Sequence, residues 1–220
     1  MDLATVDRLL TTTRSVRRRI DPSQAVDPVV IERCIDIATQ APVGGNLPRY
    51  HFLVITDRDT RAQIAALYKK SVLEMYVPLR RQQPPVFPEA EAGFFASLTY
   101  LAEHLHEVPV LIVPCVEGRP ENTKLLATAS LFANIFPAAW SLMLALRARG
   151  IGTAWTTLHL AYEEDARRIL SIPDSVTQAC LLAVAHYKGE DFKPARRIPA
   201  RERTYWDRWG ERRTSALTTG

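Results

Sequence analysis

The segment Arg14-Ser15-Val16-Arg17-Arg18 contains residue types that bind anions. Guanidinium groups donate paired hydrogen bonds to phosphate oxygens, so two or three converging arginines hold a phosphate firmly. The hydroxyl of Ser15 adds a further donor between them. The segment therefore indicates a site for a phosphorylated ligand, although clusters of arginine also bind nucleic acid or form a solvated surface.

Two further segments expose polar backbone groups. Pro42-Val43-Gly44-Gly45-Asn46 must form a turn or loop, because the proline and the paired glycines end the helix before them. The backbone amides of this loop and the Asn46 side chain are suited to the edge of a heterocycle. The run Gly152 to Leu158 presents more amides after a tight turn.

The sequence argues against several other chemistries. It contains neither a nucleophile elbow of the form G-x-S-x-G nor a Walker P-loop. Gly150-Ile151-Gly152 follows a predicted helix, whereas a dinucleotide-binding fingerprint follows a strand. His104 and His106 lie two residues apart and are poorly placed to share a metal ion, so no metal site is expected.

Apolar periodicity and capping residues predict the elements that position these segments. Asp27 is suited to cap a helix that begins at Pro28 and ends at Ala41-Pro42. The other predicted helices are 3–12, 59–70, 125–149 and 162–170, and the predicted strands are 51–56, 108–116, 151–158 and 178–187. This order predicts an α+β domain in which a few strands lie between helices.

Prolines and apolar runs add expectations for particular segments. Pro109 and Pro114 predict that the strand 108–116 lies at an edge of the sheet or ends early. The helix 125–149 is apolar nearly all round, which is typical of a core helix or a subunit contact, and Pro137 predicts a kink in it.

Two long segments lack a clear periodicity. Four prolines make residues 71–100 the least regular part of the predicted chain, and we interpret this segment as an excursion or lid over the site. The tail at about 190–220 is rich in arginine and is expected to wrap over a surface.

Length and composition describe an ordinary globular chain. The 220 residues favour a single domain, 1–220, and 47% hydrophobic residues suffice for a core. The chain lacks a run of about 18 consecutive apolar residues, so no membrane span is expected. The cysteines, Cys34, Cys115 and Cys180, are odd in number and lie in apolar settings, which predicts buried thiols and a cytoplasmic protein.

Taken together in their order, these motifs resemble the FMN-dependent nitroreductase family over nearly the full chain. The family pattern has a basic Arg-(x)-Ser-x-Arg segment, then Ala-Pro-Ser-Gly-Gly-Asn, a long apolar helix ending in Gly-Leu-Gly-Thr-x-Trp, and a basic tail. Here these correspond to Arg14 to Arg18, Ala41 to Asn46, Ala145 to Trp155, and Pro194 to Pro199. The resemblance implies a dimeric nitroreductase-like fold with a central mixed or antiparallel sheet flanked by helices.

The resemblance also implies roles for particular residues. Arg14 would meet the FMN phosphate, with Ser15 and Val16 along the phosphate or ribityl chain. Arg18 would lie near the pyrimidine edge of the flavin, where a positive charge stabilises the reduced ring. A register fixed on Ser15 instead gives this place to Arg17.

Other cofactor contacts come from segments distant in the sequence. The backbone near Trp155, Thr156 and Thr157 would approach flavin N5, and Arg197 would return to the phosphate. In the family the flavin lies at a dimer interface, so the loop would reach it from the partner subunit. The loop residues concerned are Pro42, Val43, Gly44 and Asn46.

The chain departs from the family pattern in two places. Val43 stands where a serine or threonine is common, so a hydroxyl contact is missing. Pro48-Arg49-Tyr50 replaces Gln-Pro-Trp, so a contact made by that glutamine is not expected. We interpret Tyr50 and Trp155 mainly as packing residues.

The resemblance implies a homodimeric oxidoreductase in which FMN N5 carries the chemistry and no side chain is catalytic. NADH or NADPH would deliver a hydride, and a nitroaromatic, quinone or similar electron-poor acceptor would then take it, in a ping-pong cycle. Alternatives are a flavoenzyme of the same fold with other redox chemistry (dehalogenation, dehydrogenation or flavin fragmentation), or a basic nucleic-acid-binding module. In the main interpretation neither nucleic acid nor a membrane is a partner.

Overall fold

The structure is a computed structural model that describes residues 2–120, 124–189 and 192–213. A sheet of antiparallel strands lies at the centre, in the order β1-β6-β3-β2, with β4 also paired to β6 and β5 to β3. The strands are β1 (Ile20–Asp21), β2 (Tyr50–Ile55), β3 (Val110–Glu117), β4 (Ile151–Thr156), β5 (Val176–Gln178) and β6 (Leu181–Tyr187). An isolated parallel bridge joins Ser15 to Thr153 of β4.

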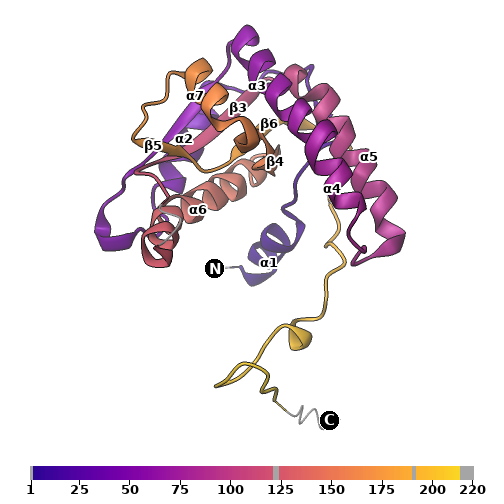
Figure 1. Cartoon of the computed structure of the whole chain (residues 1–220). Helices are drawn as coiled ribbons and strands as arrows, with labels where there is room; N and C mark the ends of the chain where they lie inside the picture. The colour runs from indigo at the N-terminus through magenta and orange to yellow at the C-terminus, as the bar shows by residue number, and fades with distance from the viewer. Residues whose placement is uncertain (1, 121–123, 190–191, 214–220) are drawn as a thin grey trace.

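Helices cover both faces of this sheet, and alternate residues of each strand face opposite sides. Leu111 and Val113 of β3 pack in a core with α3 (Arg58–Lys70) and α5 (Pro88–His104). Val110 and Ile112 face the other way, into a core with α2 (Pro28–Ala38) and α6 (Leu125–Arg147). The expected α+β architecture is confirmed, with an antiparallel sheet between two helical layers (Figure 1).

The local signals for α2 are confirmed. The Asp27 side chain accepts a hydrogen bond from the Val29 amide at 2.9 Å, and Pro28 occupies the first turn. The predicted helix 3–12 corresponds to α1 (Leu3–Thr12), and the helix 162–170 corresponds to α7 (Glu163–Leu170). Helix α2 ends three residues before the predicted boundary.

The prediction for the strand 108–116 is wrong, because β3 lies inside the sheet, paired on one side with β2 and on the other with β6 and β5. Pro114 is tolerated there because its missing N–H falls between the segments paired to β6 and β5, while its carbonyl accepts from the Ala179 amide at 2.9 Å. The same break divides the predicted strand 178–187 into β5 and β6.

The prediction of irregular structure over residues 71–100 is also wrong. Helix α3 continues through a π-helical turn, η2 (Ser71–Tyr76), into α4 (Val77–Arg81), and α5 returns beside it (Figure 1). The prolines do break the helix between Arg81 and Pro88, and Pro88 occupies the first turn of α5, a position where its missing N–H costs nothing. The segment is therefore a helical hairpin.

Helix α6 is the one helix of the described residues that is long and apolar enough to cross a membrane by length and composition. Its second half instead packs in the protein core, with Ile135, Leu142 and Leu146 fully buried. At its N-terminal end Leu125 and Leu126 are 85% and 81% exposed. The helix continues through Pro137 as a single element.

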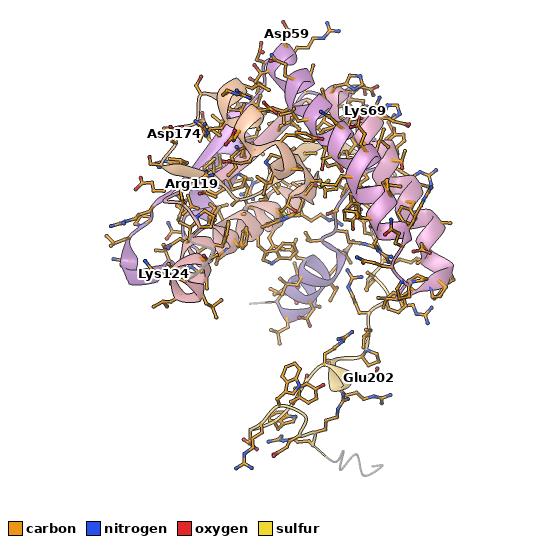
Figure 2. All side chains as sticks on the ribbon, in the orientation of Figure 1. Asp59, Lys69, Arg119, Lys124, Asp174 and Glu202 are labelled. Atoms are coloured by element: carbon orange, nitrogen blue, oxygen red, sulfur yellow. The ribbon has the colours of Figure 1, made fainter. Side chains whose placement is uncertain are left out.

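The C-terminal tail leaves the body of the chain. Residues 192–199 run beside the helical hairpin, and the segment with the short η5 turn (Ala200–Glu202) then stands apart from the remaining side chains (Figures 1 and 2). Hydrogen bonds from Arg212 to the carbonyls of Arg201 and Glu202 close this segment into a hook. The predicted tail 190–220 includes residues 190–191 and 214–220, which lie outside the described residues.

Candidate active site

The basic segment that follows α1 is fixed along the edge of β4. The Val16 amide donates to the carbonyl of Thr153 at 2.7 Å, and the Trp155 amide donates to Ser15 Oγ at 3.3 Å. Val16 is buried, so the arginines on either side of it are anchored by the core. Since Ser15 Oγ accepts one bond here, its hydroxyl hydrogen remains available to a ligand.

Gly152 permits this close packing. A Cβ at this position would lie 2.9 Å from Val16 Cγ2, too short for a real side chain, and 3.2 Å from Tyr187 Cδ1, an unusually tight contact. A glycine is therefore required where the basic segment crosses β4. This role differs from the expected presentation of backbone amides.

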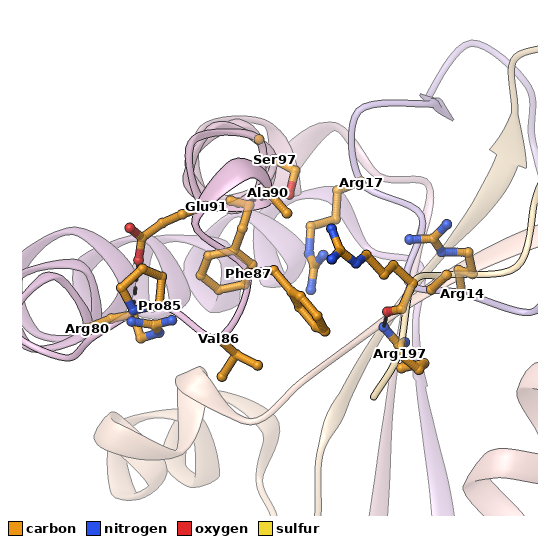
Figure 3. A pocket seen from close by; sticks show the side chains of 14 residues that line it. Arg14, Arg17, Arg80, Pro85, Val86, Phe87, Ala90, Glu91, Ser97 and Arg197 are labelled. Carbon is orange, nitrogen blue, oxygen red and sulfur yellow. Dashed lines mark hydrogen bonds and ion pairs between the residues drawn. The ribbon is translucent and has the colours of Figure 1, made fainter. Parts of the chain in front are cut away.

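A cavity of about 470 Å³ opens between the basic segment, the helical hairpin and the tail (Figure 3). Arg14, Arg17 and Arg197 lie together at one end of it, and Phe87 and Val86 project from the hairpin toward its middle. Its other lining residues are Arg80, Pro85, Ala90, Glu91, Gly93, Phe94, Ser97, Ala195 and Arg196.

A second cavity, of about 190 Å³, adjoins the first. Trp155, Thr156 and Thr157 line it, together with Tyr68, Tyr76, Leu98 and Leu158, and Arg17 and Phe94 line both cavities. The Thr156 hydroxyl accepts a hydrogen bond from the Leu158 amide at 3.2 Å, which fixes the backbone turn after β4. Burial raises the pKa of Tyr68 to about 12, so this phenol stays protonated.

A third cavity, of about 230 Å³, lies along the basic segment itself. It is lined by Arg14, Ser15, Val16, Arg17, Arg18, Arg19, Ser97 and Phe192.

Arg17 is central to this arrangement, because it lines all three of these cavities, whereas Arg18 is exposed and lines only the third. Burial lowers the pKa of Arg17, and the hydroxyls of Tyr68 and Tyr76 act in the opposite direction. Within the described part of the chain no carboxylate forms an ion pair with Arg17. A guanidinium desolvated in this way is a strong site for an anion.

The tail is held at the same cavity. Arg14 donates to the carbonyl of Lys193 at 3.2 Å, and Arg197 donates to the carbonyl of Arg196 at 3.2 Å. Arg196 forms an ion pair with Glu89 and stacks over the Phe87 ring at 5.1 Å. These contacts connect the tail with the first turn of α5 and bring Arg197 to Arg14.

The loop Pro42–Asn46 lies elsewhere. It forms the short η1 turn (Gly44–Asn46), in which Gly45 and Asn46 have φ values of 62° and 52°. The loop lies at the N-terminal half of α6, with the Asn134 side chain nearest to Gly44, on the side of the molecule away from the helical hairpin (Figure 1). A single chain therefore gathers Arg14, Ser15, Val16, Arg17, Trp155, Thr156, Thr157 and Arg197, but not this loop.

The hairpin contributes residues that the motifs do not reveal. Arg80, Phe87 and Phe94 line the large cavity, and Tyr76 lines its neighbour. The alternation of arginines, prolines and aromatics in this segment was the available signal. Over the described residues, no group of three or more His, Cys, Asp or Glu side chains is placed to hold a metal ion.

A buried polar group lies below the turn that follows β4. His159, in η4 (Leu158–Tyr162), is completely buried, and burial lowers its pKa to about 4. The Glu163 carboxylate and Gln178 act on this pKa in the opposite direction. Glu163 in turn binds Arg119 through two hydrogen bonds, at 2.8 and 3.1 Å.

The sequence and the fold of this chain are similar to those of known proteins. A protein-family model described as the nitroreductase family matches residues 10–186. Among solved structures, a BluB-like flavoprotein from Clostridium difficile 630 is similar with a TM-score of 0.70 and 19% identity, over 94% of this chain and 100% of that one. At this level of identity the similarity shows the fold.

Two further structures contain bound molecules. The FMN-dependent nitroreductase NfnB from Mycobacterium smegmatis, in complex with NADPH, matches with a TM-score of 0.67 and 19% identity, over 94% of this chain and 100% of that one. An iodotyrosine deiodinase bound to FMN and 3-iodo-L-tyrosine matches with a TM-score of 0.68 and 18% identity, over 90% and 98%.

Proposed function

The chain belongs to the nitroreductase family, and we propose that it is an FMN-dependent oxidoreductase that reduces nitroaromatic, quinone or similarly electron-poor acceptors with NADH or NADPH. The observation that carries this proposal is the convergence of Arg14, Arg17 and Arg197 beside a cavity lined by Trp155, Thr156 and Thr157. The fold similarity to flavoproteins supports it.

The donor set fits FMN. A phosphate dianion needs several cationic donors, and the Arg14 and Arg197 guanidiniums with the Ser15 hydroxyl provide them. Arg17 lies between this phosphate end and the Thr156–Thr157 cavity, partly buried and without a carboxylate partner among the described residues. When bound, FMN supplies hydride transfer at N5, accepting from the nicotinamide and donating to the acceptor.

The residues of the chain would bind and orient the flavin and stabilise its reduced form. Arg17 would lie beside the part of the flavin that gains negative charge on reduction, where its fixed cation would stabilise that charge. The backbone of Thr157, next to the turn fixed by the Thr156 hydroxyl bond, would contact the bound flavin. The helical hairpin would form one wall of the acceptor pocket.

We propose further that the protein is a homodimer and that Pro42, Val43, Gly44 and Asn46 complete the flavin site of the partner subunit. The separation of this loop from the arginines within one chain supports the proposal (Figure 1). Exposed apolar side chains on α1 and α6 suit a subunit contact. They are Leu3, Leu10, Leu125, Leu126 and Trp140.

The thiols support the cellular location that we propose. Cys34, Cys115 and Cys180 are all free and buried, as expected in a reducing environment. We propose a cytoplasmic protein.

The visible spectrum of the purified protein tests the proposed activity. We expect flavin bands near about 370 and 450 nm that bleach under anaerobic NADPH or NADH and return on addition of a nitroarene. A flavin that is not bleached by either nucleotide would contradict the proposed donor and favour a flavoenzyme of the same fold with other chemistry. Failure to bind FMN on titration would contradict the whole assignment.

Mixed dimers test the shared site. Arg17→Gln damages the arginine half of the site, and Gly44→Asp damages the loop half. The fold tolerates a side chain at position 44, because the nearest neighbour of an added Cβ is Asn134 at 3.8 Å. Each variant alone is expected to bind FMN weakly. Co-expression is expected to restore about a quarter of the tight sites, since half the dimers are mixed and each has one intact site.

The control is co-expression of each damaged variant with a tagged copy of itself, which restores nothing. Equal FMN binding by the mixture and by the separate variants would mean that each chain builds its own site.

A further inference from the structure

The large cavity contains a fourth guanidinium at the end opposite the flavin-binding arginines. Arg80 lies in the last turn of α4, across Phe87 and Val86 from Arg14 and Arg17 (Figure 3). Its side chain is 20% exposed. The flavin contacts proposed above leave this residue without a role.

Arg80 is fixed in place by contacts that use one edge of the guanidinium. Its Nη1 atom lies 3.4 Å from a Glu91 carboxylate oxygen and donates to the Gln83 carbonyl at 3.1 Å. Within the described ranges its other nitrogens form no hydrogen bond or ion pair. A guanidinium presents five N–H donors, so the remaining edge can donate a pair of bonds to a ligand.

The wall between the two cationic ends is apolar and partly aromatic. Pro85, Val86, Phe87 and Phe94 line it, and Phe94 also lines the cavity beside Trp155. A flat ring is suited to this wall, because aromatic faces and edges pack favourably against one another. The whole lining has five arginines against one carboxylate, Glu91, which favours an anionic ligand.

We propose that the acceptor is an electron-poor aromatic carboxylate, whose carboxylate binds Arg80 while its ring packs against Phe87 and Phe94. This inference rests on the proposed function, since it specifies the substrate class of the same site. Arg80 is a specificity residue, and it takes no part in hydride transfer.

Two nitroarenes that differ only in charge test the proposal. We expect the FMN-loaded enzyme to reduce 4-nitrobenzoate with a kcat/KM about 10-fold or more above that for 4-nitrobenzamide, because a charge-assisted hydrogen bond contributes about 1.5–3 kcal/mol. The intrinsic reactivity of the two rings does not explain such a preference, because the carboxylate is the weaker electron-withdrawing group.

Arg80→Gln is expected to remove this preference by lowering kcat/KM for the benzoate alone. Arg81→Gln is the matched control, because Arg81 is exposed and stacks over Phe95 at 5.5 Å outside the cavity. Calorimetric binding of 4-nitrobenzoate to the oxidised holoenzyme gives a second readout that needs no turnover, and Arg80→Gln should weaken it to the same extent.

Three results would overturn the inference. One is an equal or higher kcat/KM for the amide in the unaltered enzyme. Another is a loss in Arg81→Gln equal to that in Arg80→Gln. The third is an Arg80→Gln effect confined to the KM for NADPH, which would assign the guanidinium to a donor phosphate. If neither nitroarene is reduced, the proposed acceptor class fails, while Arg80-dependent binding of the carboxylate still decides the present inference.

Discussion

Replacing Arg17 by glutamine is expected to weaken FMN binding by about 10- to 100-fold, whereas the same change at Arg18 leaves it within about twofold. Arg17 is desolvated and faces three cavities, and Arg18 is exposed on one. Quenching of FMN fluorescence during titration of apoprotein measures both dissociation constants. The comparison of Arg17 with Arg18 thus distinguishes direct binding of FMN by one guanidinium from attraction by the overall positive charge of the segment.

Arg17→Lys refines this test. A lysine retains the charge but loses the planar fork, so partial recovery of affinity is expected. Equal losses in the Arg17 and Arg18 variants would instead point to long-range attraction, and both losses would then fall steeply with added salt.

The stability of the fold is expected to fall by about 3 kcal/mol between pH 6.5 and 4 through His159 alone. Burial lowers its pKa to about 4, so the unfolded chain binds this proton more readily than the folded chain. The contribution of neutral His159 to stability is complete above pH 6.5, the ordinary pKa of histidine, and is lost as the pH falls toward 4. Urea unfolding followed at a series of pH values measures the slope.

His159→Phe and His159→Gln supply the controls. Both remove the titrating group, so the slope in this pH window should flatten even if either variant is less stable at pH 7. Below pH 4.5 all forms should lose stability, because Glu163 has its pKa lowered by the hydrogen bond and charge of Arg119. An unchanged slope in both variants would assign the acid sensitivity to other groups.

Local signals predicted much of the fold because they act within a few residues. The Asp27 cap, Pro28 in the first turn and the apolar stripe of α2 specify that helix without help from distant residues. The position of β3 could not be predicted in this way. It depends on where Pro114 lies relative to two partner strands, and only the assembled sheet determines that.

The hairpin shows a similar limit. The prolines break the helix between Arg81 and Pro88, but they did not reveal that the residues on either side are helical. Pro78 lies in the first turn of α4 within a longer continuous helix, and Pro88 begins the next. A proline at a helix start and a proline in a loop look alike in a single sequence.

The part of the candidate site that lies in the basic segment was predictable, because a sequence motif marks it. Ser15 fixes the register of the basic segment, since its bond with the Trp155 amide leaves Arg17 facing the cavities. Counting from Arg14 places Arg18 at the flavin edge, and FMN titration of the two variants decides between the arginines. Arg80 has no motif, because its place in the cavity depends on the contact of α4 with Glu91 of α5, and this is a tertiary property.

The π-helical turn between α3 and α4 has a consequence for insertions and deletions. The Val77 amide bonds to the Val72 carbonyl five residues back, so the turn accommodates one residue more than an α-helical turn. Loss of one residue within 71–76 would restore α-helical bonding and leave Arg80 facing the cavity. The same loss at 58–70 or 77–79 would rotate Arg80 by about 100° about the helix axis. Loss of one residue is therefore neutral for acceptor recognition at the π turn and disruptive on either side of it.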